Sequence, residues 1–294
     1  MEIQDKAKLN LEDMKSGGFI KERKKDLFTV RLRVPGGRLS FEKMEKMAEV
    51  AKKYGRYGYV HVSVRQSIEI VGVHFDDLDA VIKELDSVGQ KIASCGARVR
   101  VPTACGGCEY NPNGIMDAQK MVLEVDEKFF GRECHHKFKI GFAGCPIDCP
   151  KSSEMDLGFM GMVDPEWSED ACTGCTLCSK ACIEGAIVSD SDGKPIYDPG
   201  KCVYCGDCIN RCPTDAWGEK RKGWFVRVGG KHGRHPRSAD DIIKFLPNEK
   251  VCDFIDKTVT WYNNNASGRE RIGTCFDRVG LDKYKKEVVE DFKE

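Results

Sequence analysis

Twelve of the 16 cysteines in this 294-residue chain stand at spacings that suit metal ligands. Eight of them form two C-x2-C-x2-C-x3-C runs: Cys172, Cys175, Cys178, Cys182, Cys202, Cys205, Cys208 and Cys212. Four others precede these runs as two close pairs: Cys105, Cys108, Cys145 and Cys149. Thiolates at such spacings favour soft metals and iron-sulfur clusters. Because the two groups follow different spacing rules, we predict a catalytic centre joined to its own electron supply.

The eight-cysteine group has the spacing of bacterial two-cluster ferredoxins, and Pro213 follows its last cysteine. In that pattern the fourth cysteine of each run binds the cluster of the other run. We therefore expect one 4Fe-4S cluster on Cys172, Cys175, Cys178 and Cys212. A second cluster would be bound by Cys202, Cys205, Cys208 and Cys182. A zinc ribbon also uses C-x2-C pairs, but it needs only four ligands per metal and has no use for the added C-x3-C.

Composition limits the class of protein. Lys plus Arg and Asp plus Glu both number 47, so the formal net charge is zero and gives no support for a nucleic acid or membrane partner. No apolar run approaches the roughly 18 residues of a membrane span, and no apolar signal stretch is visible. We therefore expect a cytoplasmic iron-sulfur protein instead of a secreted disulfide framework.

The first part of the chain predicts a polar arm or short helix over residues 1–26, followed by a ferredoxin-like α/β sandwich over residues 27–90. Residues 28–34 alternate like a strand, and Ser40 has the position of a helix cap before a helix to about Lys53. One or two strands over 59–71 and a second helix over 76–88 complete this unit.

The remainder predicts a second α/β domain, residues 91–164 and 219–294, interrupted by the cysteine-rich insert at 165–218. We expect a helix over 114–128, strands over 137–142 and 224–228, and amphipathic helices over 238–246 and 248–265. The fold class is α+β, with an inserted ferredoxin domain.

Several motifs together resemble those of sirohaem-dependent sulfite and nitrite reductases. Cys145-Pro146-Ile147-Asp148-Cys149, after a Lys-Phe-Lys strand, resembles the sirohaem-binding segment. The other matching segments are Arg33–Gly37, Arg65-Gln66, Cys95–Gly107 and Gly229–Arg234. Their order is similar to that of small anaerobic and archaeal sulfite reductases with an inserted ferredoxin domain.

The resemblance implies an anion-binding set made of Arg33, Arg100, Lys137 and Lys139. Such cations hold a small oxyanion, offset charge that develops on its oxygens and donate protons. Strand geometry independently predicts that Lys137 and Lys139 share one face while Phe138 points to the other.

The resemblance also implies that Cys149 bridges a third 4Fe-4S cluster to the sirohaem iron. That cluster would be bound by Cys105, Cys108, Cys145 and Cys149, and the sirohaem carboxylates would be bound by Arg31, Arg65, Gln66, Lys231 and Arg234. The chain departs from the family at its first cysteine pair, since the usual C-x5-C would place a cysteine where Asn111 stands. We expect Cys108 to be the ligand because an amide is a poor donor to a soft cluster; a noncysteine ligand is the alternative.

These features predict the catalytic subunit of a sirohaem sulfite reductase, which reduces sulfite to sulfide with six electrons. The alternatives are nitrite as the substrate and a noncatalytic electron-transfer subunit. No G-x-G-x-x-G follows a strand, so the electrons are expected from a low-potential donor such as reduced ferredoxin or a flavin-bearing subunit.

The larger members of the family contain two copies of this unit, which implies a partner here: a second copy or a paralogue. By that analogy the cations of one subunit face the sirohaem held by Cys149 of the other. The remaining cysteines are expected to be buried structural thiols, with Cys95 the most plausible participant: Cys95, Cys134, Cys252 and Cys275. His135 and His136 are expected to be surface imidazoles, with proton donation the alternative.

Overall fold

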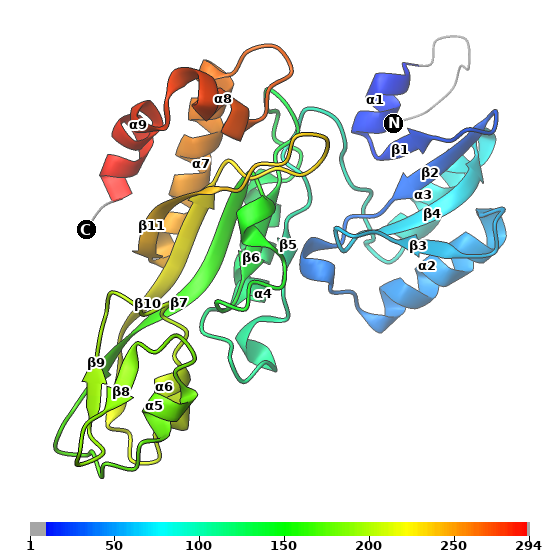
Figure 1. Cartoon of the computed structure of the whole chain (residues 1–294). Coiled ribbons are helices and arrows are strands. Elements are labelled where there is room, and N and C mark those ends of the chain that lie inside the picture. The colour runs from blue at the N-terminus through cyan, green and yellow to red at the C-terminus, as the bar shows by residue number, and fades with distance from the viewer. Residues whose placement is uncertain (1–9, 293–294) are drawn as a thin grey trace.

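The computed structural model describes residues 10–292, which form two sheets and a small cysteine-rich lobe (Figure 1). In Figure 1 the four-stranded sheet lies to the right, the five-stranded sheet to the left and the lobe below it. Within residues 10–292, no helix is long and apolar enough to cross a membrane.

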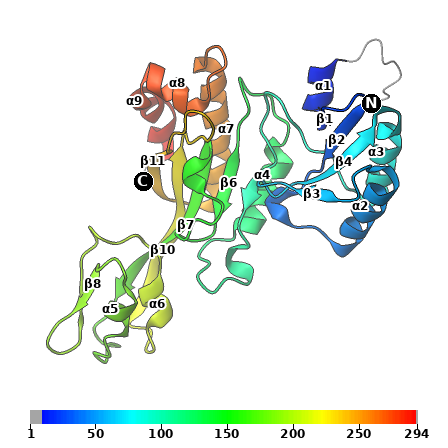
Figure 2. The same ribbon diagram turned by 45° about the vertical axis from the view of Figure 1, so that its right-hand side comes forward.

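The first sheet is antiparallel and has the order β1-β2-β4-β3. Its strands are β1 (Phe19–Lys21), β2 (Leu27–Arg31), β3 (Val60–Val62) and β4 (Ile68–His74). Helices α2 (Phe41–Tyr54) and α3 (Leu78–Asp86) cover one face (Figure 2). This arrangement confirms the ferredoxin-like sandwich.

A helix cap and the burial of apolar residues explain how the first sheet and its two helices form. The Ser40 hydroxyl accepts the Lys43 backbone N–H at 3.3 Å and so begins α2. Val50 of α2 and Val81 of α3 are fully buried in one core with Val30 and Ile70 of the sheet.

Within the arm or short helix expected over residues 1–26, the described part contains a short helix and a strand, and residues 1–9 lie outside the described part. Helix α1 (Leu11–Ser16) leads into β1, which pairs with β2 at the edge of the sheet. Phe19 and Met14 are buried in the core of this sheet. Two apolar side chains in a charged segment were therefore enough to anchor it.

The second sheet has the order β11-β10-β7-β6-β5. Its strands are β5 (Thr103–Ala104), β6 (Ile140–Ala143), β7 (Leu157–Trp167), β10 (Trp217–Val228) and β11 (Asp240–Leu246). The pairs β5–β6 and β6–β7 are parallel, whereas β7–β10 and β10–β11 are antiparallel.

Four helices share a core with the second sheet: α4 (Ala118–Phe129), α7 (Asn248–Asn265), α8 (Ile272–Val279) and α9 (Leu281–Tyr284). Phe142 stacks on Phe159 with ring centroids 4.7 Å apart, and Trp224 meets Phe142 edge-on at 5.5 Å. The Trp224 indole N–H donates to the Asn248 side chain at 2.7 Å, which fixes the start of α7 to the sheet.

The helix expected over residues 238–246 is wrong, because this segment is strand β11. Ile243 and Leu246 pair with β10 and are buried, while Asp241 and Lys244 are exposed. A seven-residue amphipathic stretch fits both periodicities, and pairing with β10 decides for the strand.

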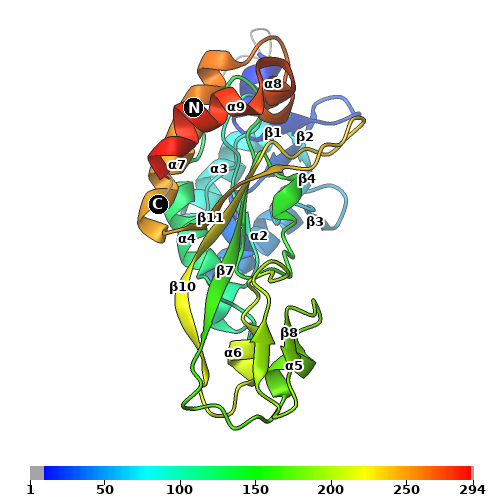
Figure 3. The ribbon, with the colours of Figure 1, turned by 60° about the vertical axis from the view of Figure 1, so that its left-hand side comes forward.

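Strands β7 and β10 run on as a two-stranded ribbon into the lobe (Figure 3). There, Trp167 pairs with Trp217, and the residues between them form α5 (Leu177–Ala181), β8 (Ile187–Ser189), β9 (Pro195–Tyr197) and α6 (Asp207–Arg211). The remaining elements are short turns: Pro35–Gly37, Phe75–Asp77, Gly107–Glu109, Ser152–Glu154, Lys285–Val289 and Glu290–Phe292.

Candidate active site

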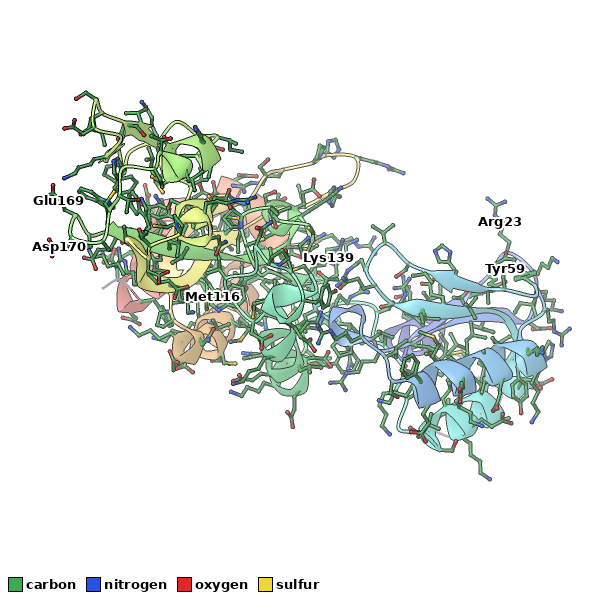
Figure 4. The ribbon with its side chains drawn as sticks, turned by 90° about the horizontal axis from the view of Figure 1, so that it is seen from below. Arg23, Tyr59, Met116, Lys139, Glu169 and Asp170 are labelled. Atoms are coloured by element: carbon green, nitrogen blue, oxygen red, sulfur yellow. The ribbon has the colours of Figure 1, made fainter. Side chains whose placement is uncertain are left out.

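The parallel strands give the second sheet two chemically different ends. Arg100 and Lys139 precede β5 and β6 at one end, whereas Cys105 and Cys145 follow these strands at the other. We call the first the basic end, made of Arg31, Arg65, Arg100, Lys137, Lys139 and Arg271. The second is the cysteine end, made of Cys105, Cys108, Cys145 and Cys149. In the view of Figure 4, Lys139 lies between the two sheets.

A cavity of about 300 Å³ lies at the basic end, where the first sheet meets the segment that leads to β5. Arg31, Arg65 and Arg100 line it. Arg65 Nη2 donates to the Val101 carbonyl at 2.6 Å, and Arg100 Nη2 donates to the Gly96 carbonyl at 2.9 Å. The Nε atoms of Arg65 and Arg100 are buried and have no hydrogen-bond partner among the described residues. Buried donors without partners fit an anionic ligand.

The Lys137-Phe138-Lys139 segment alternates as predicted. Phe138 is fully buried, whereas both lysines are half-buried. The Arg100 N–H donates to the Phe138 carbonyl at 2.9 Å, which holds this segment beside the one that leads to β5. The segments that carry Arg100 and the two lysines therefore lie side by side where they lead into β5 and β6.

Burial, followed by like charges, lowers the pKa values of the cations at the basic end. Burial, then Arg65 and Arg271, lower the pKa of Lys139 to about 8. Burial and then Arg100 lower the pKa of Arg65 to about 10. The pKa of Lys137 is also lowered, by burial first and then by Arg271. An anion would relieve this repulsion, and a lysine with a pKa of about 8 is a practical proton donor near neutral pH.

Arg33 does not join the other predicted cations. Its Nε donates to Asp126 Oδ2 at 2.8 Å, and its guanidinium lies 3.9 Å from the centroid of the Phe130 ring. In this structure the charge of Arg33 is balanced by a buried carboxylate. Arg31, the last residue of β2, lines the cavity instead and pairs there with Glu69 at 2.7 Å.

Two residues of the basic end were not expected from the sequence. Asp156, at the entry to β7, is fully buried, and Arg271, immediately before α8, is 8% exposed. Arg271 Nε donates to Asp156 Oδ1 at 2.7 Å, and its Nη2 binds Oδ2. No sequence motif marks either residue, since they meet only through the fold. His136 also lies here, and burial followed by Lys137 lowers its pKa.

Lys231 and Arg234 lie on the loop between β10 and β11, at the same end of the sheet. Lys231 Nζ donates to Thr274 Oγ1 at 2.7 Å and is half-buried. Arg234 is exposed. Both stay predicted cofactor contacts, with Arg234 free to reach a group outside this chain.

Gln66 contacts backbone, not the cavity. Its φ of 61° is left-handed, and its side chain binds both polar groups of Ala104, with Nε2 to the carbonyl at 2.6 Å and the N–H to Oε1 at 3.0 Å. Gln66 therefore clamps β5 immediately before Cys105. The structure gives this side chain a role in placing the strand, and its contact with sirohaem stays a prediction.

Backbone donors surround the sulfur atoms of the cysteine end. Cys105 Sγ accepts the N–H groups of Gly144 at 3.0 Å and Gly107 at 3.4 Å. Hydrogen bonds to sulfur are typical of iron-sulfur sites, where they tune the potential. The loop therefore fits a thiolate ligand.

The structure bears on the choice between Cys108 and Asn111. The Asn111 amide donates to Cys145 Sγ at 3.9 Å, and its oxygen accepts the Asn113 N–H at 3.1 Å. Cys108 is exposed on the same loop. Asn111 is thus engaged as a donor to a neighbouring sulfur, which leaves Cys108 available as the fourth ligand.

The Cys145–Cys149 loop is braced by Asp148, whose φ of 52° is left-handed. Its carboxylate accepts the Ser152 N–H at 2.7 Å and the Ser152 hydroxyl at 2.8 Å. Arg227 Nη1 lies 3.4 Å from the same carboxylate. The brace leaves Cys149 exposed.

In the lobe, the eight cysteines gather in two hollows with the predicted exchange. One hollow is lined by Cys172, Cys175, Cys178 and Cys212. The other is lined by Cys182, Cys202, Cys205 and Cys208. Burial raises the pKa of Cys205 to about 11 and of Cys208 to about 12, so a bound metal would have to stabilise their thiolates.

No three His, Cys, Asp or Glu side chains among residues 10–292 converge on a single-ion site. A 4Fe-4S cluster sets a looser requirement, because each thiolate binds a different iron. A further cavity, of about 270 Å³, is lined by Cys145 together with Cys182 and Cys205. The second hollow of the lobe therefore adjoins the cysteine end.

The four remaining cysteines are buried, as predicted: Cys95, Cys134, Cys252 and Cys275. Cys95 lies at the basic end, where its sulfur accepts a hydrogen bond from Arg31 Nη1 at 3.0 Å.

Comparisons with known proteins agree with this arrangement. The family model described as "Nitrite and sulphite reductase 4Fe-4S domain" matches residues 95–294, and "Nitrite/Sulfite reductase ferredoxin-like half domain" matches residues 20–88. Coenzyme F420-dependent sulfite reductase from Methanocaldococcus jannaschii is 31% identical over 94% of this chain, which spans 44% of that protein. One subunit of the anaerobic sulfite reductase from Salmonella typhimurium is 26% identical over 88% of this chain and 82% of its own.

Solved structures show the same fold. The crystal structure of dissimilatory sulfite reductase I has a TM-score of 0.75 at 21% identity and covers 90% of this chain and 69% of its own. The Mycobacterium tuberculosis NirA protein has a TM-score of 0.67 at 15% identity and covers 98% of this chain and 47% of its own. With both family models matched in order along nearly the whole sequence, the chain belongs to the sirohaem-dependent nitrite and sulfite reductase family and is an oxidoreductase of that family.

Proposed function

We propose that this chain is the catalytic subunit of a sirohaem sulfite reductase, which converts bisulfite, six electrons and six protons into hydrosulfide and three waters. The observation that carries the proposal is the basic end. There Arg65 and Arg100 line a cavity, their buried Nε–H groups have no partner among the described residues, and Lys139 has a pKa of about 8.

The cations have two tasks in this proposal. Arg65 and Arg100 bind and orient the oxyanion, because guanidinium groups match its oxygens with paired donors. Lys137 and Lys139 offset charge on those oxygens, and Lys139 donates a proton when an oxygen leaves as water. A proton lost from Lys139 is then regained from solvent.

Cys149 and the basic groups fit sirohaem, which when bound supplies an electron-rich iron at which the substrate sulfur is reduced. Cys149 is exposed and close enough to Cys145 to affect the pKa of that thiol, so its sulfur is able to reach a group outside the loop. Arg31, Lys231 and Arg234 would bind carboxylates of the macrocycle.

Three 4Fe-4S clusters are proposed, and the cavities order them. The set with Cys182 shares a cavity with Cys145 of the cysteine end, whereas the set with Cys172 lines a separate hollow of the lobe. Electrons from an external low-potential donor would pass from the set with Cys172 to the set with Cys182 and then to the cysteine end. Glu169 and Asp170 lie on the outer part of the lobe in Figure 4, where a donor would approach.

The separation of the two ends supports a site shared between subunits. An extended strand rises about 3.3 Å per residue, so Lys139 and Cys145, at opposite ends of β6, lie roughly 15–20 Å apart along the strand. Cations that contact the substrate of a Cys149-linked iron would then come from a second copy or a paralogue.

Anaerobic purification followed by sirohaem and iron quantification tests this function. We expect sirohaem absorption bands, iron for three clusters, and sulfide production from sulfite with an artificial reductant. Nitrite turnover under the same conditions compares the two substrates. A chain with full cluster iron but no sirohaem uptake would instead be a noncatalytic electron-transfer subunit.

A further inference from the structure

The ion pair between Asp156 and Arg271 joins parts of the chain that are far apart in sequence. Both oxygens of the Asp156 carboxylate bind the Arg271 guanidinium, from Nε at 2.7 Å and from Nη2. Asp156 is fully buried and Arg271 is 8% exposed. The pair therefore links the entry to β7 with the start of α8, away from bulk water.

The same carboxylate holds the predicted proton donor. Asp156 Oδ2 accepts the backbone N–H of Lys139 at 2.8 Å, and the Asp156 carbonyl accepts the Gly229 N–H at 2.9 Å. Asp156 thus ties together the entry to β6, the entry to β7 and the exit of β10. This hydrogen bond holds the Lys139 backbone, and with it the point from which the Lys139 side chain extends into the basic end.

After burial, the largest influences on the Lys139 ammonium come from charged neighbours. Arg65, from the β3–β4 connection, and Arg271, before α8, lower the pKa of Lys139, as does Lys137 on its own segment. Asp156 has the opposite effect and raises this pKa. The two partners of one ion pair therefore act on Lys139 with opposite signs.

We propose that Asp156 and Arg271 form a positioning pair for the reduction, holding the Lys137–Lys139 segment in the basic end and setting how readily Lys139 gives up its proton. The kinetic part rests on the proposed sulfite reductase function. Stability alone does not account for this ion pair, because apolar residues can replace many buried ion pairs without loss of stability.

The test is competitive acetylation of the purified holoenzyme across pH, with the Lys139 peptide quantified by mass spectrometry. The midpoint of labelling reports the deprotonation of Lys139. Asp156→Asn should lower this midpoint by roughly half a unit or more, because an attractive charge is lost. Arg271→Gln should raise it by a similar amount, because a repulsive charge is lost. The high-pH limit of sulfite turnover should move in the same direction as each midpoint.

Opposite signs separate the proposal from a merely structural role. If the pair only held the fold together, either substitution would admit water and move the midpoint upward toward that of an ordinary lysine. Upward shifts in both variants, or no shift in either, would overturn the proposal. If the wild-type enzyme shows no sulfite turnover but the opposite labelling shifts are present, the proposed function fails while the electrostatic coupling stands.

A second pair of variants covers the case in which a single substitution fails to fold. Arg271→Lys keeps the positive charge, so the midpoint should stay within about 0.3 units of wild type. The double variant Asp156→Asn/Arg271→Gln leaves no unpaired buried charge, and its midpoint should lie between those of the two single variants, since Arg271 and Asp156 act on Lys139 with opposite signs. A rise of about half a unit or more in Arg271→Lys would contradict the proposal.

Discussion

The three parallel strands of the second sheet place groups of opposite charge preference at their two ends. At the basic end, Arg65, Lys137 and Lys139 are brought together against their mutual repulsion, and burial lowers the pKa of each. At the cysteine end, backbone N–H groups point at Cys105 Sγ, ready for a negative sulfur. The basic end therefore suits an anionic ligand, and the cysteine end suits a metal cluster bound by thiolates.

In the proposed function, the two ends of the sheet belong to different sites. The basic end suits an anion, and the cysteine end suits a metal cluster that would make its thiols thiolates. β6 separates the two by its own length, so a substrate bound at one end does not reach the other end of the same sheet. Pairing opposite ends of two subunits would satisfy both.

The largest expected effect concerns the ligand choice at the cysteine end. Cys108→Ala should remove one cluster and reduce sulfite turnover by more than about a hundredfold. Removing a group that only hydrogen-bonds a metal ligand costs up to about a hundredfold, and removing the ligand itself should cost more. Asn111→Ala, which removes only the hydrogen bond to Cys145, should retain the cluster and most of the activity. Iron content and electron paramagnetic resonance spectra check this. Cluster loss in Asn111→Ala, with retention in Cys108→Ala, would reverse the assignment.

At the basic end, the proton donor gives the next effect. Lys139→Met should lower kcat by about a hundredfold through the lost charge and proton. Because the active form of Lys139 is protonated and its pKa is about 8, wild-type turnover should fall as pH rises through about 8. Lys128→Met on the exposed face of α4 is the matched control and should behave as wild type. A pH profile that is unchanged in Lys139→Met would exclude this residue as the donor.

A smaller effect is expected from the clamp between the ends. Gln66→Glu keeps an acceptor for the Ala104 N–H but puts a carboxylate against the Ala104 carbonyl, which should displace Cys105. We expect about a tenfold loss of turnover and an altered spectrum of the coupled cluster. Gln90→Glu removes comparable bonds to the Arg33 and Lys91 carbonyls and should leave that spectrum unchanged. Equal spectra in both variants would limit Gln66 to a role in stability.

Local spacing made part of this molecule predictable. Two runs of C-x2-C-x2-C-x3-C specify short loops whose exchange of the fourth cysteine appears in the two hollows. Strand alternation predicted that Lys137 and Lys139 share one face opposite Phe138, whereas the family resemblance selected them as anion-binding cations. The family, the ferredoxin-like sandwich and the second α/β domain were also accessible, because several motifs occur in a fixed order.

Contacts distant in sequence made the rest unpredictable. Arg271 and Asp156 are 115 residues apart and belong to no motif. Arg33 matched a family cation, but its pairing with Asp126 depends on where α4 packs. The amphipathic pattern of residues 238–246 fits a helix or a strand, and the sequence did not show that β10 would be available to pair with this segment.

The most direct test of a shared site uses two inactive subunits in one dimer. Differently tagged Arg100→Ala and Cys149→Ala chains are co-expressed, and heterodimers carrying both tags are purified before sulfite turnover is measured. If cations and cysteines come from different subunits, one of the two sites is intact, and the heterodimer should have about half the wild-type activity. Inactive heterodimers with intact ferredoxin clusters would rule out a site shared in this way.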